Sequence, residues 1–352
     1  MSAAWSRVVR RLLLAFLALL LLGSGCAAWA WWSFQRLLEP AQPDGTEPLV
    51  ITLAEGTGAA QIARQLEERG LIQSALAFRV YVRREGLAHR LRAGEYELSP
   101  AMSVPEIVTR LVRGQVVTYR VTIPEGRTVE QIIATVAQST FFDAGALRRA
   151  VDAAAADWPY LPEGVELREP LEGYLFPDTY VFTRTTTAEH LIAGMLEGFR
   201  RALGEDGARR AEALGMTVHE IVTLASIIER EAQVPEERPL ISAVYHNRMR
   251  RGMKLDADPT VLYALGRTDG RLLYEDLKVD SPYNTYRFVG LPPGPIAAPG
   301  AAALEAALYP ADVDYLYFVA KGDGSGEHVF ARTYEEHLRN VRQFRSQQAS
   351  RP

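Results

Sequence analysis

The sequence predicts an α+β protein in which one N-terminal transmembrane helix precedes two folded parts. Three observations support this class: an apolar run near the N-terminus, a strand-turn-helix pattern that occurs twice, and a second apolar run that ends in carboxylates. With 352 residues and 48% hydrophobic content, the chain can bury a large core and form more than one unit. Its net charge of -4 lacks the basic surplus of nucleic-acid-binding proteins, so we predict no nucleic-acid partner.

Residues 12–33 are predicted to form the transmembrane helix, and residues 1–11 a cytoplasmic tail. The run from Leu12 to Trp32 is apolar apart from Ser24, and at about 1.5 Å per residue it matches a hydrocarbon core of about 30 Å. Basic residues precede the run and mostly acidic residues follow it: Arg7, Arg10 and Arg11 before; Arg36, Glu39, Asp44 and Glu47 after. This asymmetry places the N-terminus in the cytoplasm and the remainder of the chain outside.

Two other interpretations of this run are a cleaved secretory signal and a lipoprotein signal that ends at Cys26. The run continues into bulky tryptophans, and Gly23 stands where a lipoprotein signal has a leucine-like residue. Both features favour a retained anchor. Cys26 is the only cysteine, so the chain has no intrachain disulfide. Residues 34–48 are rich in proline and polar residues, which predicts an extended linker between the membrane and the folded part.

A strand-turn-helix pattern occurs at Ile51–Ile62 and returns without a gap at Val121–Ile132. The residues that match are Thr52/Thr122, Leu53/Ile123, Glu55/Glu125, Gly56/Gly126, Gln61/Gln131 and Ile62/Ile132. We interpret the match as one supersecondary unit used twice, with chance similarity as the alternative. The copies divide the folded chain into a first subdomain, residues 49–117, and a larger domain, residues 118–345.

The first subdomain also contains a predicted helix at 75–85, a strand at 92–98 and a helix at 103–113. Ser103 and Glu106 have the spacing of a capping box at the start of that last helix. This combination of short strands and helices resembles the LysM-like fold, which holds glycan strands. A scaffold subdomain without a ligand is the alternative.

The second apolar run, from Ile221 to Ile228, predicts an internal helix because it has no polar stripe to face water. Glu229 follows directly and continues the interior stripe, so burial is expected to raise its pKa toward neutrality. The alternative is a carboxylate that points to solvent and pairs with an arginine. Glu231 shares this ambiguity, but the two side chains diverge by about 200° on a helix and cannot face one substrate bond together.

Two further segments carry candidate binding residues. Leu171–Tyr180 combines aromatic rings with acids, as sugar-binding grooves do, and supplies Glu172 and Tyr174; a core role for the rings is the alternative. The loops after residue 255 are rigid and polar, and supply Asp258, Tyr283, Asn284, Thr285 and Tyr286. No spacing typical of a metal site, a phosphate loop or a nucleophile elbow is present, so we predict no metal and no cofactor.

Five ordered motifs resemble the YceG-like family of endolytic murein transglycosylases. They are LASIIERE at 224–231, DPT at 258–260, YNTY at 283–286, GLPPG at 290–294 and YLYFV at 315–319. The resemblance implies a single-pass protein of the inner membrane whose catalytic part is periplasmic and follows a LysM-like subdomain. It also implies cleavage of nascent peptidoglycan within the glycan strand, with a 1,6-anhydro-N-acetylmuramic acid end as product, beside the peptidoglycan synthases as expected partners.

By this resemblance Glu229 is the catalytic acid. Asp258 and residues 283–286 match motifs of the family, and we infer from their place in those motifs that they line the groove. A transglycosylase uses the C6 hydroxyl of its own substrate as nucleophile, so one carboxyl can act as acid and then as base. Two other functions remain open. One is a glycan hydrolase that pairs Glu229 with Glu172, Asp256 or Asp258; the other is a membrane-anchored scaffold that binds peptidoglycan without cleaving it.

Overall fold

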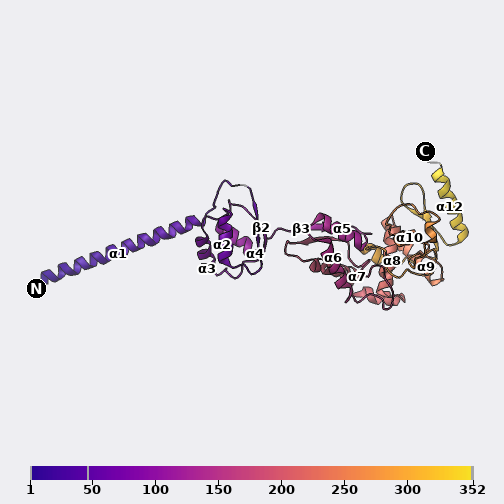
Figure 1. Cartoon of the computed structure of the whole chain (residues 1–352), viewed down its shortest axis with the longest axis horizontal. Coiled ribbons are helices and arrows are strands. Elements are labelled where there is room, and N and C mark those ends of the chain that lie inside the picture. The colour runs from indigo at the N-terminus through magenta and orange to yellow at the C-terminus, as the bar shows by residue number, and fades with distance from the viewer. Residues whose placement is uncertain (1, 46, 350–352) are drawn as a thin grey trace. The chain divides into compact units, whose positions relative to one another are not determined.

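The computed structural model describes residues 2–45 and 47–349, and within them the side chains from Leu13 to Gln347 except that of Ala15. Within these residues the fold is mixed α+β, with twelve α-helices and six strands that pair into three two-stranded sheets. The chain divides into two compact units, residues 1–119 with 183–185, and residues 120–182 with 186–352. The division lies close to the predicted boundary between residues 117 and 118. Figure 1 labels most of the helices of both units and the strands β2 and β3.

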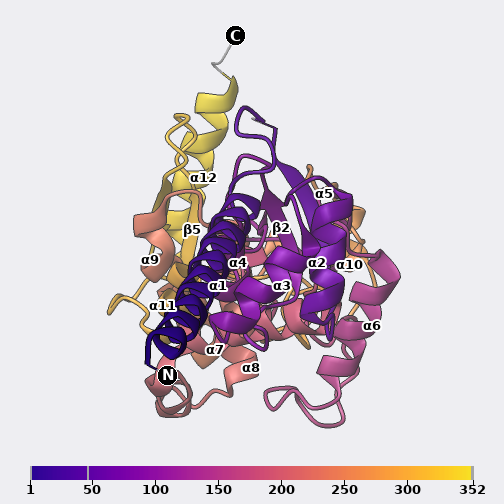
Figure 2. The same ribbon diagram turned by 90° about the vertical axis from the view of Figure 1, so that its left-hand side faces the viewer.

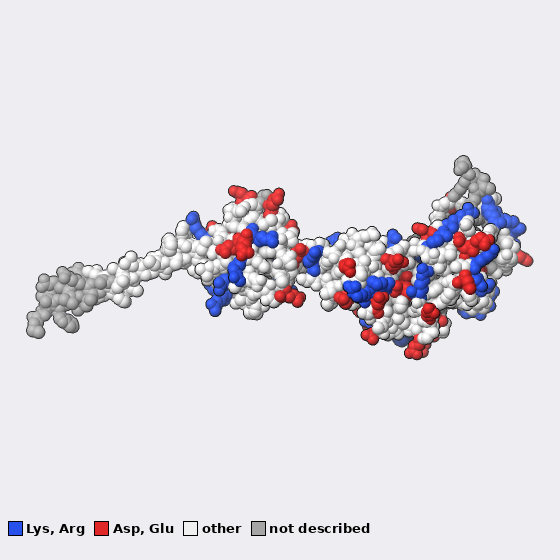
Figure 3. Space-filling model, viewed as in Figure 1, with Lys and Arg blue, Asp and Glu red and all other residues white. Residues whose placement is uncertain are grey.

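The N-terminal helix α1 (Ser2–Leu37) is longer than the predicted span. Its apolar stretch Phe16–Leu37 is long and apolar enough to cross a membrane, and in Figure 3 the described part of this stretch is almost free of charged side chains. The arginines of the predicted tail, residues 1–11, lie outside the described side chains. Over the remaining visible surface, acidic and basic side chains are interspersed. The helix therefore fits either a membrane anchor or a signal sequence.

The predicted linker, residues 34–48, is not wholly extended in this structure. Leu38 is buried, and its carbonyl accepts a hydrogen bond from the Val104 amide at 2.9 Å. The Gln42 amide donates to Pro100 at 3.0 Å, and the Gln73 side chain donates to the carbonyl of Pro40 at 2.9 Å. Proline and polar residues predict a free linker only when they lack partners, and here the first unit supplies those partners.

The first unit is built from β1 (Leu49–Leu53), α2 (Ala59–Glu68), α3 (Ala75–Arg84), β2 (Gly94–Leu98) and α4 (Val104–Arg113). The two strands pair antiparallel, with Ile51 opposite Tyr96. The predicted capping box is present, since the Ser103 amide donates to Glu106 Oε2 at 2.8 Å. Figure 2 shows the three short helices gathered around β2. The LysM-like resemblance of this unit stays a prediction.

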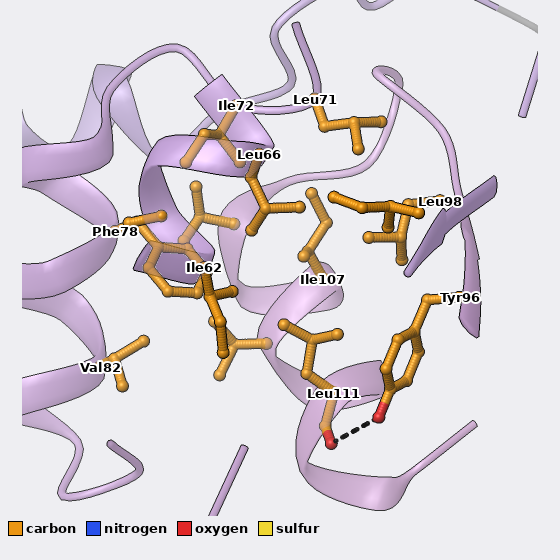
Figure 4. Close-up of a cluster of buried hydrophobic side chains, with 14 of the residues drawn as sticks. Ile62, Leu66, Leu71, Ile72, Phe78, Val82, Tyr96, Leu98, Ile107 and Leu111 are labelled. Atoms are coloured by element: carbon orange, nitrogen blue, oxygen red, sulfur yellow. Dashed lines mark hydrogen bonds between the residues drawn. The ribbon is translucent and has the colours of Figure 1, made fainter. Parts of the chain in front are cut away.

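The core of the first unit lies between these helices and the strand pair, as Figure 4 shows. Leu66, Phe78 and Leu111 are fully buried, and the Tyr96 hydroxyl donates to the carbonyls of Arg92 at 2.8 Å and Leu111 at 3.4 Å. Burial of each such apolar side chain contributes about 1.5–3 kcal/mol. The unit therefore has an apolar core of its own.

The second copy of the repeat consists of β3 (Tyr119–Thr122), of which residues 120–122 belong to the second unit, and α5 (Val129–Ser139). Both copies fold as strand, turn and helix, and the turn glycines Gly56 and Gly126 have positive φ angles of 76° and 74°. That backbone conformation is open to glycine at little cost. Both copies thus have the predicted strand, turn and helix.

The remaining elements of the second unit surround one internal helix, α8 (Val218–Glu231). The strand β4 pairs with β3, and β5 pairs with β6. Helix α7 bends at Gly204, whose φ of 70° is not helical. Helices α7, α9, α10 and α11 contact α8. The bounds are α6 (Ala144–Ala155), β4 (Thr179–Phe182), α7 (Ala188–Ala213), α9 (Arg238–Arg250), α10 (Asp258–Ala264), α11 (Ala301–Leu308), β5 (Tyr317–Ala320), β6 (His328–Ala331) and α12 (Tyr334–Ala349).

We predict that Leu66→Ala destabilises the first unit by about 2–5 kcal/mol, because the cavity left in a closed core removes both transfer energy and packing contacts. The matched control is Leu76→Ala on the neighbouring helix, where the leucine is 67% exposed. Hydrogen exchange of the full-length chain in detergent, read on peptides from residues 59–113, measures both changes. Equal protection in the two variants would contradict the described core.

Candidate active site

Helix α8 lies inside the second unit, as its apolar sequence predicts. Its start is fixed by a capping box between Thr217 and Glu220, and its residues 221–228 are all buried. The Ser226 hydroxyl accepts a hydrogen bond from the Ile296 amide at 3.0 Å, which fastens the proline-rich loop to the helix. The last turn of the helix therefore carries its glutamates to a defined place beside that loop.

The Glu229 side chain is 8% exposed and is held by two donors. Its Oε1 lies 3.4 Å from Arg238 Nη2, and its Oε2 accepts a hydrogen bond from the Gly300 amide at 3.1 Å. Gly300 is the N-cap of α11, so the amide end of that helix faces the carboxylate. The surroundings are more polar than the helix pattern predicts, because both donors come from segments later in the chain. The sequence left open the alternative that Glu229 points to solvent and pairs with an arginine. The pairing with Arg238 agrees with that alternative, but the Glu229 side chain is buried and does not point to solvent.

Glu125 is a second carboxylate at this place, and it is not among the site residues predicted from the sequence. A methyl group built on Gly300 would lie 1.8 Å from Glu125 Oε1, so the carboxyl group of Glu125 covers the α-carbon of this glycine. Burial raises the pKa of Glu125, the charge of Glu229 raises it further, and Arg238 opposes both effects. The glutamate shared by both copies of the repeat was the sequence signal that could have identified it.

The turn that carries Glu125 is fixed to the loop that precedes α11. The Gly126 amide donates to the Ala298 carbonyl at 2.8 Å, and the Ala298 amide donates to the Arg127 carbonyl at 2.8 Å. A pair of backbone hydrogen bonds leaves the turn little freedom to move away from the loop. Glu125 and Gly300 are therefore held together by the backbone.

Glu231 has a different set of partners from Glu229, in agreement with the predicted divergence of the two side chains. The Tyr245 hydroxyl donates to Glu231 Oε1 at 3.2 Å. Burial raises the pKa of Glu231 to about 7, and the nearby charge of Asp258 adds to the rise. The two glutamates thus belong to two separate polar clusters at the end of one helix.

The candidate residues of the later loops divide into exposed and buried groups. The Tyr286 hydroxyl donates to Asp258 Oδ1 at 2.6 Å, and both residues reach the surface. Tyr283, Asn284 and Thr285 are buried, with 4%, 0% and 1% of their surface exposed. Asp258 and Tyr286 can therefore contact a ligand directly, whereas the three buried residues support the loop from inside.

Glu172 and Tyr174 are also buried. Glu172 accepts hydrogen bonds from the Val129 amide at 2.9 Å and the Tyr263 hydroxyl at 3.2 Å, and it lines a cavity of about 600 Å³. Tyr174 has no exposed surface, and its ring centroid lies 5.1 Å from that of Phe199. For Tyr174 this burial favours the alternative of a core ring over direct contact with a sugar.

The second carboxylates suggested by the sequence have other partners. Asp256 lies 3.1 Å from Arg248, while Asp258 and Glu172 bind the tyrosines already described. In their place, Glu125 is the carboxylate that lies beside Glu229. Among the residues that the structure describes, no group of three or more His, Cys, Asp or Glu side chains is arranged to hold a metal ion.

Comparison with known proteins identifies the family. The family model described as the YceG-like family matches residues 51–343. The chain belongs to the YceG-like family. The match includes Glu125, both glutamates of α8 and all the loop residues above.

Two relatives and one solved structure of this family are similar over most of the chain. An endolytic murein transglycosylase of Bacillus subtilis is 37% identical, over 86% of this chain and 86% of that protein. One of Streptococcus pneumoniae is 33% identical over 93% of this chain and 63% of its own length, so the chain spans less than two thirds of that relative. A crystal structure of a yceG-like protein from Listeria monocytogenes has 36% identity and a TM-score of 0.57, over 83% of this chain and 99% of that one.

We predict that Glu172→Gln removes a large part of the pH dependence of stability of this YceG-like chain. Burial raises the pKa of Glu172 to about 8. The folded state thus binds this proton more tightly than the unfolded state, so stability falls as pH rises from the unfolded value toward 8. Because of this one carboxyl group, the free energy of unfolding of the wild type should fall by about 3 kcal/mol between about pH 5 and about pH 8. The denaturant midpoints measured at the two pH values should differ less for Glu172→Gln than for the wild type. The same difference in both proteins would refute the raised pKa of Glu172.

We predict that Gly300→Ala destabilises the chain by about 1 kcal/mol or less, because the new methyl group overlaps only the carboxyl group of Glu125, the end of a flexible, exposed side chain that can move aside. Gly300 has an ordinary φ of -76°, so the cost is steric overlap and not backbone strain. The control is Gly194→Ala in α7, where a methyl group meets nothing within 4 Å; it should be neutral or stabilising. Thermal unfolding compares the two variants, and a loss of several kcal/mol in Gly300→Ala would contradict the prediction by showing that the carboxyl group of Glu125 is fixed in place.

Proposed function

We propose that this chain is an endolytic murein transglycosylase. It cleaves the β-1,4 bond between N-acetylmuramic acid and N-acetylglucosamine within nascent glycan strands, and leaves a 1,6-anhydro-N-acetylmuramic acid end. The observation that carries the proposal is the place of Glu229, a mostly buried carboxylate held by two donors at the end of an internal helix. Support also comes from relatives that are named endolytic murein transglycosylases at 37% and 33% identity.

One carboxyl group is sufficient for the proposed reaction. Glu229 first donates its proton to the glycosidic oxygen as the bond to C1 of the muramic residue breaks, and the shortened strand leaves with that proton. The Glu229 carboxylate then takes the proton of the C6 hydroxyl while the C6 oxygen bonds to C1. The proton is returned, no water is consumed, and the product is an intramolecular ether. A site that has to hold only the strand and one acid fits this chemistry.

The partners of Glu229 suit its second role. After the first step the side chain is a carboxylate, and Arg238 and the Gly300 amide both stabilise that charge. Donors that are already in place at the start of the reaction cost no reorganisation when the charge develops. We therefore assign Arg238 and Gly300 to orient Glu229 and to stabilise it between the two proton transfers.

We propose that Asp258 and Tyr286 bind the glycan strand, because Asp258 is exposed, Tyr286 is only half-buried, and a 2.6 Å hydrogen bond joins them. Tyr283, Asn284 and Thr285 fix the loop beneath them. The Asn284 amide nitrogen, for example, donates to the carbonyls of Leu277 and Val279, at 2.9 Å each. Glu172 and Tyr174 then act through the packing of the domain.

We propose that α1 is a retained anchor in the inner membrane, with the N-terminus cytoplasmic and the catalytic part periplasmic. Its apolar stretch is long enough for one crossing, and a murein substrate lies outside that membrane. The first unit is proposed to be LysM-like and to contact glycan or orient it. Peptidoglycan synthases are the proposed partners, since an enzyme that cuts new strands works where those strands are made.

A two-carboxylate hydrolase is the second candidate, and the position of Glu125 beside Glu229 is the observation that favours it. The two enzymes differ in their products. A hydrolase adds one water and leaves a reducing end, whereas a transglycosylase adds none and leaves an anhydro end. A scaffold without activity would release no products.

We predict that Glu229→Gln lowers the release of anhydro-ended fragments from purified peptidoglycan by at least about 100-fold, as loss of a general acid does. The control is Glu236→Gln, an exposed residue of the short helix between α8 and α9; it should retain wild-type activity. Mass spectrometry of the digests by full-length protein gives both the rate and the product. Release that persists in Glu229→Gln would refute the assignment, and products heavier by one water would establish a hydrolase.

A further inference from the structure

The side chain of Arg238 has few hydrogen bonds of its own to hold it beside Glu229. Its Nη2 lies 3.4 Å from Glu229 Oε1, which is long for a hydrogen bond. Its Nε is buried and has no hydrogen-bond partner in the part of the chain that the structure describes. The place of this guanidinium therefore depends largely on the backbone that carries it, at the first residue of α9.

The start of α9 lacks the usual side-chain cap. Glu237 occupies the N-cap position, but its carboxylate makes no hydrogen bond to the amides of its own helix. Pro239, the second residue of the helix, has no amide hydrogen to donate. Because an N-cap side chain commonly holds the first turn of a helix in place, the first turn of α9 needs a support from elsewhere in the fold.

That support comes from His328 on β6, which binds the carboxylate of Glu237 at two points. The His328 amide donates to Oε1 at 2.8 Å, and the ring Nδ1 lies 2.7 Å from Oε2. The side chains of His328 and Glu237 are only 8% and 11% exposed. Polar groups this deeply buried cost free energy unless they are paired. The Glu237–His328 pair therefore fastens the residue before Arg238 to a distant strand.

The other end of α9 is fastened to the same hairpin. The Asn247 side chain donates to the Tyr315 carbonyl at 2.9 Å, and Arg248 Nε donates to the Leu316 carbonyl at 2.7 Å. Tyr315 and Leu316 directly precede β5, which pairs with β6. The hairpin thus holds α9 near both ends, and the Glu237–His328 pair is the contact next to Arg238.

We propose that Glu237 and His328 are positioning residues, which set Arg238 against Glu229 through the first turn of α9. This inference rests on the proposed function, in which Arg238 stabilises the Glu229 carboxylate between the two proton transfers. Release of that turn lengthens a contact that is already 3.4 Å. A misplacement of about 1 Å near a reacting group can lower a rate by up to about 100-fold. Glu237 and His328 do not contact the sugar in this scheme.

The test is kcat and KM of the full-length enzyme in detergent, measured as anhydro-ended product from purified glycan strands well below the unfolding temperature. His328→Ala removes the side-chain contact and should lower kcat about tenfold, with KM nearly unchanged because strand binding is not affected. His328→Asn carries an amide nitrogen at the place of Nδ1 and should recover most of kcat. A pair that only stabilised the fold would change thermal unfolding and leave the kcat of the folded enzyme unchanged.

A double-mutant cycle determines whether the effect passes through Arg238. Arg238→Gln removes the cation and should lower kcat about 100-fold, as loss of a charge-stabilising donor does. In that background His328→Ala should lower kcat no further, because no guanidinium is left to position. The matched control is Lys321→Gln, which breaks the exposed 2.8 Å ion pair with Glu327 on the same hairpin; it should retain wild-type kcat.

Wild-type kcat in folded His328→Ala overturns the inference, and so do losses that multiply in the double variant, because the pair then acts independently of Arg238. Wild-type kcat in Arg238→Gln overturns it as well. If His328→Ala does not fold, Glu237→Gln, which keeps the shape of the side chain and one acceptor oxygen, decides by the same cycle. Glu229→Gln is measured in parallel: if it stays active, the proposed function fails, whereas if it is inactive and the losses multiply, only the role of the Glu237–His328 pair fails.

Discussion

The burial of α8 is the constraint on which the second unit depends. Residues 221–228 have no polar stripe, so the helix is stable only where other elements cover every side, and α7, α9, α10 and α11 supply that cover. The same requirement fixes the last turn, since a helix packed on all sides cannot rotate without losing contacts. Glu229 and Glu231 therefore emerge in set directions, one toward Gly300 and Arg238 and the other toward Tyr245.

The polar groups at the end of α8 are satisfied by segments that the helix itself brings together. Ser226 holds the proline-rich loop, that loop holds the turn of Glu125, and the start of α11 follows at Gly300. Each contact is modest by itself, at about 1 kcal/mol for a hydrogen bond. Their joint effect is to place Glu229 beside the Gly300 amide and Arg238, with the turn of Glu125 fixed against the loop that leads to Gly300.

The two units of the chain use the strand-turn-helix pattern differently. Glu55 and Glu125 are both exposed in their turns, but only Glu125 has its carboxyl group against another part of the chain, at Gly300. The positive φ of the turn glycine is the same in both copies. A shared local geometry thus serves a stable core in one unit and a charged site in the other, because the neighbours of the turn differ.

Local physics let the sequence alone determine much of this protein: the apolar N-terminal helix, the repeated unit with its turn glycines, the capping box of Ser103, and the buried helix that ends at Glu229. Each depends on residues a few positions apart. Tertiary structure alone decided that residues 38–42 pack on the first unit, that Tyr174 is in the core, and that Arg238, Gly300 and Glu125 surround Glu229. These contacts join residues far apart in the chain, and no periodicity or propensity encodes which distant segments will meet.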